Sequence, residues 1–212
     1  MRIIHLFADL CNLYGDYGNV CGLKRMLENK GQNVDVEHLS IDDEIDISGA
    51  DLVFIGSATE RNRTVAMEYL KSYKENIKTA LDSGTVILAT GNSFEMFGQS
   101  VTDCDGIKCE GLSFFPYETV EGKERIVTDS LCTTSLCGGD IIGFVNKASL
   151  TAGVDSPLFD VKQGSGNGKA DNKEGVHYGN FYGTHLIGPV LIRNPQLCEY
   201  FADMLIKATP HN

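Results

Sequence analysis

The first half of the chain alternates short apolar runs with longer stretches in which apolar residues recur every three to four positions. The apolar and β-branched runs predict buried strands at residues 3–7, 34–39, 51–55 and 85–89. The helical spacing predicts a helix that ends near residue 29 and a long helix over residues 61–83. Because strands and helices alternate, we expect a mainly parallel sheet with helices on both faces.

The second half has short alternating stretches and glycine-rich turns. These stretches predict strands at residues 107–117, 125–131, 140–145, 176–182 and 190–192. Residues 163–169 are glycine-rich and predict a surface loop, and residues 195–208 predict an amphipathic helix with Pro195 in its first turn. No change in composition marks a linker, so we expect a single α/β domain over residues 1–212, with antiparallel strands added to the parallel sheet.

Residues 85–98 have the pattern of a nucleophile elbow, the tight strand-turn-helix that holds one side chain above a sheet. A buried strand leads into Thr90-Gly91-Asn92, and residues 93–98 predict the start of a helix. An elbow needs small residues two positions before and after its apex, and Ala89 and Ser93 satisfy this requirement. The apex is then Gly91, which has no side chain to act as a nucleophile.

Composition narrows the functional classes. The chain has 212 residues and a formal net charge of −11, and no basic face stands out, which argues against nucleic-acid binding. No apolar run is long enough for a membrane span, and the N-terminus has no signal-peptide pattern. We therefore expect a cytoplasmic protein.

The sequence contains no motif with the spacing of a cofactor or metal site. The glycines at positions 15, 18 and 22 have the wrong spacing for a dinucleotide loop and predict a structural turn. Seven cysteines are an odd number in a chain expected to be cytoplasmic, so we expect free thiols. The pairs at 104/109 and 132/137 share one spacing, but it is not the usual spacing of a zinc site. Cys137-Gly138-Gly139 precedes a strand-like run and predicts a hairpin turn. His185 is either a general base or a packed strand residue.

Several motifs together resemble the class I glutamine amidotransferase superfamily, in its cobyric-acid-synthase-like (CobB/CobQ) branch. More narrowly, the chain resembles the GatD-type glutaminase subunit of lipid II isoglutaminyl synthase. The resemblance covers nearly the whole chain and rests on residues 12–19, 54–56, 60–61, 89–98, 110–112, 142–146, 173–178 and 183–189. It implies a flavodoxin-like class I glutamine amidotransferase fold and hydrolysis of the side-chain amide of glutamine. It also implies transfer of ammonia to a Mur-ligase-like (MurT-type) partner, with no cofactor.

The resemblance also indicates that the catalytic positions are substituted. The family cysteine corresponds to Gly91 and the family histidine to Ile187, while the oxyanion loop corresponds to Gly56-Ser57-Ala58. An asparagine-histidine pair of the family is replaced by Asn146-Lys147.

Four other residues are considered as substitutes for the missing pair: Thr90, Ser93, Glu95 and His185. An elbow centred on Thr90 would place Leu88 where a small residue is needed, and Ser93 should point elsewhere. His185 lies two residues from Ile187, which on a strand is the same face about 6.6 Å along.

We therefore expect a GatD-type subunit without glutaminase activity. Two alternatives remain open at this point. One is an enzyme with different chemistry in the same pocket. The other is a binding or sensor module for a glutamine-like small molecule, held by Gly56, Ser57, Asn92 and His185.

Overall fold

The first of two sheets has the parallel core that the alternating pattern predicts. The computed structural model describes residues 1–208. Within them, β1 (Arg2–Leu6), β2 (Asp35–Leu39), β3 (Leu52–Ile55), β4 (Val86–Thr90), β11 (Val176–Tyr178) and β12 (Phe181–Thr184) form a sheet in the order β11-β12-β4-β3-β1-β2. All neighbours are parallel except β11, which pairs antiparallel with β12.

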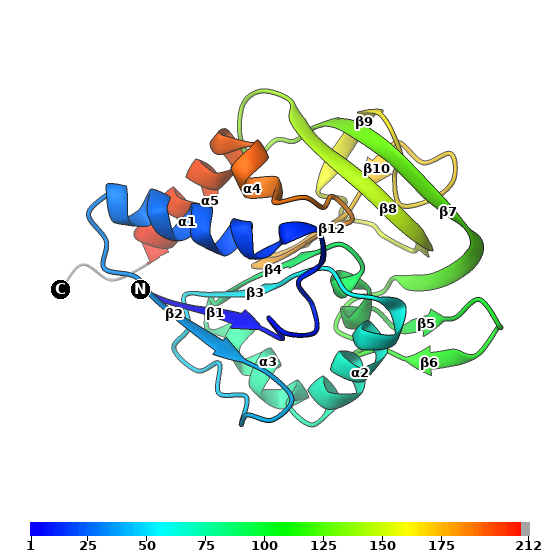
Figure 1. Ribbon diagram of the computed structural model, residues 1–212, viewed down its shortest axis with the longest axis horizontal. Coiled ribbons are helices and arrows are strands. Elements are labelled where there is room, and N and C mark those ends of the chain that lie inside the picture. The colour runs from blue at the N-terminus through cyan, green and yellow to red at the C-terminus, as the bar shows by residue number, and fades with distance from the viewer. Residues whose placement is uncertain (209–212) are drawn as a thin grey trace.

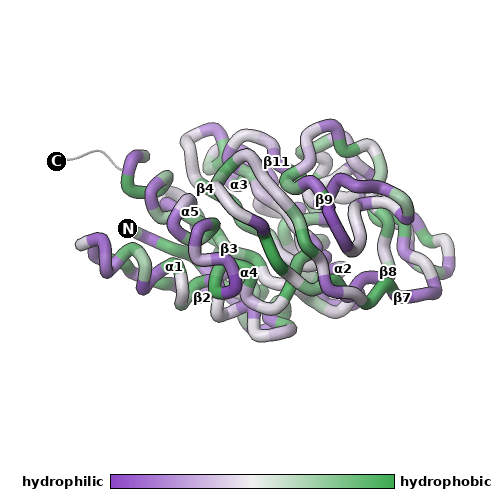
Figure 2. Tube along the Cα trace, turned by 90° about the horizontal axis from the view of Figure 1, so that it is seen from above, coloured by the Kyte–Doolittle hydropathy of each residue, from purple (hydrophilic) through white to green (hydrophobic). Residues whose placement is uncertain are grey.

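Helices cover both faces of this sheet, because successive strand side chains point to opposite sides. In β1, Ile4 packs in the cluster under α2 (Glu60–Lys71) and α3 (Lys74–Asp82). Ile3 packs in the other cluster, with α1 (Tyr17–Asn29), α4 (Val190–Arg193) and α5 (Pro195–Ala208). Figure 1 shows the two helical layers on either side of the strands. Figure 2 shows hydrophilic residues concentrated on the outer parts of the chain.

The second half builds a separate, largely antiparallel sheet. Its strands are β5 (Ser100–Thr102), β6 (Lys108–Glu110), β7 (Glu118–Thr133), β8 (Ile141–Ala152), β9 (Phe159–Gln163) and β10 (Lys173–Glu174). The order is β10-β9-β7-β5-β6, and β8 pairs along β7. The long β7–β8 hairpin leans toward the first sheet, and the backbone of Ile187 bonds to Phe144 of β8.

The structure confirms the α/β class and corrects several element boundaries. The predicted helix over 61–83 is two helices, because the backbone of Tyr73, at φ −110° and ψ 15°, leaves the helical conformation. Residues 190–192 form α4 instead of a strand, since the Asn194 side chain bonds the carbonyl of Val190 and favours a helical turn.

Other predicted strands are shorter or longer than their patterns suggested. Only Lys108–Glu110 of the predicted strand 107–117 is extended, and the stretch 176–182 splits into β11 and β12 around a turn. The predicted strands 125–131 and 140–145 are the middle of β7 and the start of β8, and residues 134–140 connect them as the predicted hairpin turn.

Glycines 18 and 22 serve close helix packing. A Cβ at Gly18 would lie 2.7 Å from the Pro189 side chain, and one at Gly22 would lie 2.6 Å from the Ile192 side chain. The rigid Pro189 ring makes glycine necessary at position 18, and a side chain at position 22 would require the exposed Ile192 side chain to move. Close packing of α1 and α4 accounts for these glycines without a phosphate loop.

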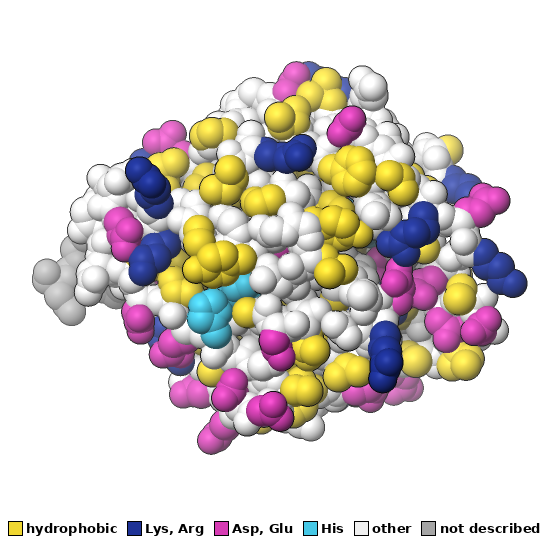
Figure 3. All heavy atoms as spheres, viewed as in Figure 1, with side chains coloured by type: hydrophobic (Ala, Val, Ile, Leu, Met, Phe, Trp, Pro, Cys, Tyr) yellow, Lys and Arg dark blue, Asp and Glu magenta, His cyan; other side chains and the backbone are white. Residues whose placement is uncertain are grey.

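One face of the molecule carries both apolar and acidic surface. Figure 3 shows hydrophobic side chains gathered in the middle of this face and acidic ones along its lower edge. No helix among residues 1–208 is both long and apolar enough to cross a lipid bilayer.

A buried histidine makes stability depend on pH. His5 in β1 is 0% exposed, packs on Tyr17 and Phe54, and neither ring nitrogen has a hydrogen-bond partner. Burial, with a smaller contribution from His38, lowers the pKa of His5 to about 4. The unfolded chain then binds the extra proton more readily, so stability falls as the pH drops from about 6.5 to about 4.

We expect this histidine to account for roughly 1–3 kcal/mol of stability loss between pH 7 and pH 4. Urea unfolding of the wild type and of His5→Phe at several pH values measures it, and the variant should show a flatter pH dependence. His38→Phe is the control and should keep most of the dependence, because burial is the larger cause. Equal slopes for His5→Phe and the wild type would contradict this assignment.

Candidate functional site

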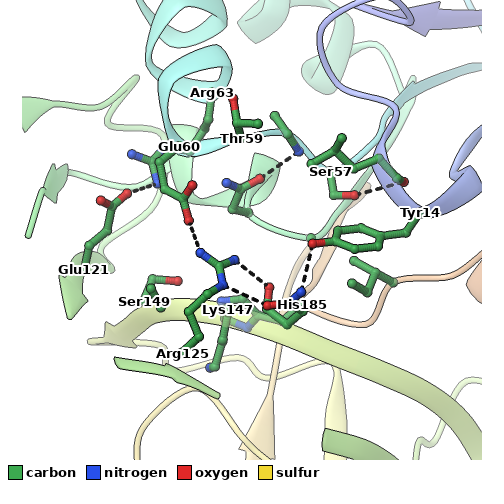
Figure 4. A pocket seen from close by; sticks show the side chains of 17 residues that line it. Tyr14, Ser57, Thr59, Glu60, Arg63, Glu121, Arg125, Lys147, Ser149 and His185 are labelled. Atoms are coloured by element: carbon green, nitrogen blue, oxygen red, sulfur yellow. Dashed lines mark hydrogen bonds and ion pairs between the residues drawn. The ribbon is translucent and has the colours of Figure 1, made fainter. Parts of the chain in front are cut away.

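A pocket of about 230 Å³ lies where the carboxyl ends of β3 and β4 meet the β7–β8 hairpin. Its walls come from η1 (Leu13–Gly15), the loop between β3 and α2, the turn after β4, and the segment after β12. Figure 4 shows polar side chains from these elements pointing toward one another around it. The carboxyl edge of a parallel sheet is where α/β proteins usually bind ligands.

The predicted elbow is present, and the space above its apex is filled. Strand β4 ends at Thr90, Gly91 has φ +64°, and the 3₁₀ helix η2 (Ser93–Phe97) follows. A Cβ built on Gly91 would lie 2.2 Å from Cβ of Ser57 and 3.3 Å from Cγ2 of Ile187. No side chain fits at position 91 unless Ser57 moves.

Ser57 is held in this place by Asp16. Its backbone N–H and its hydroxyl both donate to Oδ2 of Asp16, at 2.6 and 2.5 Å. The next backbone N–H, that of Ala58, donates to Oδ1 of Asn92 at 3.0 Å. Burial raises the pKa of Asp16 in spite of its bonds from Ser57. Two successive N–H groups of this loop are thus occupied by side chains of the protein itself.

The predicted substitutes for a nucleophile do not reach the pocket. Thr90 and Ser93 are fully buried behind its lining, and the Ser93 hydroxyl donates to the carbonyl of Gly56. Gly56 also lies outside the lining, against the Cys11 carbonyl and Asp16. The Ser93 side chain thus points toward the loop after β3 and not into the pocket.

The thiol of Cys11 is also buried near the elbow, beside Ser93. Burial is the main reason that its pKa is raised to about 12. A thiol with a pKa this high carries almost no thiolate at neutral pH and is a poor nucleophile.

A buried ion network forms the floor under the pocket. Nη1 of Arg63 lies 2.8 Å from Glu95 and 2.6 Å from Glu121, and Ser149 donates its hydroxyl to Glu95. Burial acts to raise the pKa of Glu95, but His185 and the charge of Arg63 outweigh it, and the pKa lies below its usual value. Glu95 is therefore an ionised structural anion, which lies behind the lining and not in it.

Sequence reasoning missed Arg63, although a signal was available. Arg63 precedes Ala66, Met67 and Leu70 on the buried stripe of α2, so a charge stood on an apolar face. A cation at such a position needs a buried anionic partner.

His185 lines the pocket, as predicted, but follows the end of β12 at Thr184 instead of lying within a strand. Its Nδ1 lies 3.3 Å from Glu174 and its Nε2 lies 3.5 Å from Glu95, without the alignment of a hydrogen bond. Its ring packs edge-on against Phe94 at 4.6 Å. Within residues 1–208, no hydroxyl or thiol hydrogen-bonds this imidazole.

Lys147 anchors the glycine-rich loop to the site. Its Nζ donates to the carbonyls of Gly166 and Asn167 at 2.6 and 3.2 Å, and burial lowers its pKa. The predicted surface loop over residues 163–169 is thus tied to β8 through a buried lysine. No group of His, Cys, Asp and Glu side chains in the described part of the chain is placed to hold a metal ion.

Known proteins are similar to this chain in sequence, and solved structures are similar to it in fold. The CobB/CobQ-like glutamine amidotransferase domain matches residues 2–195. The lipid II isoglutaminyl synthase (glutamine-hydrolyzing) subunit GatD of Staphylococcus aureus is 30% identical over 203 residues, which is 96% of this chain and 83% of that protein. The subunit of the same name from Streptococcus pneumoniae is 32% identical over 210 residues, covering 98% and 81%.

Solved structures agree on the fold. A glutamine amidotransferase crystal structure superposes with a TM-score of 0.62 at 12% identity, covering 95% of this chain and 98% of the other. A glutamine amidotransferase from Thermotoga maritima gives a TM-score of 0.58 at 12% identity, covering 98% and 84%. The sequence match over nearly the whole chain, together with this fold, places the protein in the CobB/CobQ-like glutamine amidotransferase family.

Proposed function

We propose that this chain is a GatD-type subunit of a lipid II amidating complex that does not hydrolyse glutamine. The observation that carries the proposal is the filled space above Gly91. In the family pattern this position holds the attacking cysteine, and here Ser57 and Ile187 occupy the volume that a side chain would need. Acyl transfer through a covalent intermediate needs a nucleophile within reach of a base, and the His185 ring has none.

The loop after β3 supports the same conclusion. Amide hydrolysis needs backbone N–H groups aimed at the oxyanion that forms. In this chain the N–H groups of Ser57 and Ala58 donate to Asp16 and Asn92 instead. A substrate oxygen would have to displace a buried carboxylate to use the first of them.

The relatives support the role of a subunit. Both relatives are named as GatD subunits of lipid II isoglutaminyl synthase. We propose that this chain likewise works beside a Mur-ligase-like (MurT-type) partner in the cytoplasm, in the production of amidated cell-wall precursor.

Ammonia release from L-glutamine tests the proposal, with the purified chain alone and with its co-expressed ligase partner. We expect the rate of ammonia release to equal the rate in buffer alone. This rate is several powers of ten below that of an enzyme with an intact nucleophile-base pair. Binding of L-glutamine by calorimetry in the same preparations tells an inert pocket from one that binds without turnover. Turnover abolished by Ser93→Ala or His185→Ala would overturn the proposal.

A gain-of-function variant provides the positive control. Ser57→Gly, Gly91→Cys and Ile187→His together restore the family cysteine and histidine and remove the serine that fills the site. Ammonia release by this triple variant, absent in the wild type, would show that the assay detects the reaction in this scaffold.

A further inference from the structure

A row of polar contacts bridges the mouth of the pocket. Nδ2 of Asn146 donates to the Tyr14 hydroxyl at 2.9 Å, and Nε of Arg125 donates to Oδ1 of Asn146 at 2.8 Å. Nη1 of Arg125 pairs with Glu60 at 2.7 Å. Figure 4 shows this row running from Tyr14 to Glu60 along one side of the pocket. We call Tyr14, Asn146, Arg125 and Glu60 the clasp, and it joins η1, the β7–β8 hairpin and α2.

The exposed Arg125–Glu60 pair of the clasp is weaker than the buried ion pairs of Arg63 below the pocket. The side chains of Glu60 and Arg125 are 40% and 44% exposed, so water and salt screen their attraction. The Arg63–Glu95 pair below them is 3% and 0% exposed, and breaking it would leave buried charges without partners. Of these two sets of contacts, those of the clasp therefore cost less free energy to break.

Two members of the clasp, Tyr14 and Arg125, lie on irregular backbone. Tyr14 has φ 60° and ψ 20°, the left-handed region that costs free energy for a residue with a Cβ. The pairing of β7 with β8 shifts register between Glu121 and Ile126, the interval that contains Arg125. The polar contacts hold these segments in place, and relief of the Tyr14 backbone favours the open arrangement once they break.

The space behind the clasp fits a small polar molecule. Its volume of about 230 Å³ lies below the range of sites for drug-sized ligands, and matches a metabolite near the size of an amino acid. The side chains of His185, Asn92 and Ser149 line it, and the ring nitrogens of His185 lie 3.3 Å from Glu174 and 3.5 Å from Glu95. We propose that the clasp gates this pocket, and that a compact polar molecule reaches His185 only after the Tyr14–Asn146 hydrogen bond breaks. This gating does not depend on the absence of turnover.

A thiol placed inside the pocket tests the gate. Ile187 is 2% exposed and lines the pocket beside Gly91, so Ile187→Cys puts a reporter behind the clasp. The probe is uncharged iodoacetamide, and peptide mass spectrometry separates the reporter from the seven native cysteines. The labelling rate is compared in the reporter alone, with Tyr14→Phe, and with the matched control Tyr17→Phe, whose ring is as exposed as that of Tyr14 but lies outside the clasp.

We expect Tyr14→Phe to speed labelling of the reporter about 3- to 10-fold, because it removes one hydrogen bond from the closed state. Tyr17→Phe should change the rate less than about twofold. The buried native Cys132 is the internal measure of global unfolding, and its labelling should stay constant. Equal reporter rates in the two tyrosine variants, or a parallel rise at Cys132, would overturn the proposal.

A second variant probes the other end of the clasp. Glu60→Gln weakens the pair with Arg125 while keeping the side-chain size, and it should also speed labelling of the reporter. If Tyr14→Phe and Glu60→Gln both leave the reporter rate unchanged, access is controlled elsewhere and the gate assigned here is wrong.

Discussion

Replacing Arg63 by methionine is expected to lower the free energy of unfolding by about 3–5 kcal/mol. Arg63 is the cation between Glu95 and Glu121, and its side chain is 3% exposed. Without it, two carboxylates lie under the pocket with no guanidinium to pair with them. Urea unfolding at pH 7.5 measures the loss.

Two further variants make this prediction specific. Arg61→Met removes a cation from the exposed side of the same helix and should cost less than about 0.5 kcal/mol. Adding Glu95→Gln and Glu121→Gln to Arg63→Met removes the stranded charges and should recover part of the loss. If Arg63→Met and Arg61→Met were equally stable, the buried network would not have the role assigned to it.

Placing a cysteine at Gly91 is expected to lower the free energy of unfolding by roughly 2–4 kcal/mol. Two causes add: the backbone has φ +64°, which disfavours a side chain, and the new Cβ would lie 2.2 Å from Cβ of Ser57. The contribution of the steric overlap can be measured separately, because the overlap involves the Cβ of Ser57 and not its hydroxyl.

A double-mutant cycle separates the two causes. In a Ser57→Gly background the overlap is gone, and Gly91→Cys should cost about 1–2 kcal/mol. In a Ser57→Ala background the Cβ remains, and the full cost should persist. Chemical unfolding of the single and double variants gives the coupling energy. The same cost for Gly91→Cys in all three backgrounds would mean that Ser57 does not obstruct position 91.

Local pattern was enough to predict the framework and the empty apex. The apolar runs at β1, β3 and β4 and the tight turn after β4 are properties of neighbouring residues, and the structure contains all of them. The hairpin at Cys137-Gly138-Gly139 was found for the same reason, since a strand-like run follows the glycines. Short apolar runs were less reliable. Val190-Leu191-Ile192 reads as a strand by its apolar pattern, but the Asn194 side chain bonds the carbonyl of Val190 and favours a helical turn.

The candidate site was predicted only in outline. Ser57, Asn92 and His185 were placed at the pocket from their motifs, and the structure brings these three side chains to its lining. Glu95 was considered as an acid or base, but Arg63 and Ser149 hold it behind the lining. Asp16 and Arg63 were missed because their partners lie 41 and 32 positions away in the chain.

The order of residues along the chain by itself determined the alternation of strands and helices, the glycine at the top of the elbow and the net negative charge, since each depends on near neighbours or on a sum over the chain. Only the tertiary structure decided that Ser57 fills the space beside that glycine, that Asp16 and Asn92 take up the loop N–H groups, and that four residues from three segments cross the mouth of the pocket. These contacts join parts of the chain that are far apart in sequence. Parallel pairing of β1, β3 and β4 brings Asp16, Ser57 and Asn92 to one edge of the first sheet, and the β7–β8 hairpin of the second sheet adds Arg125 and Asn146.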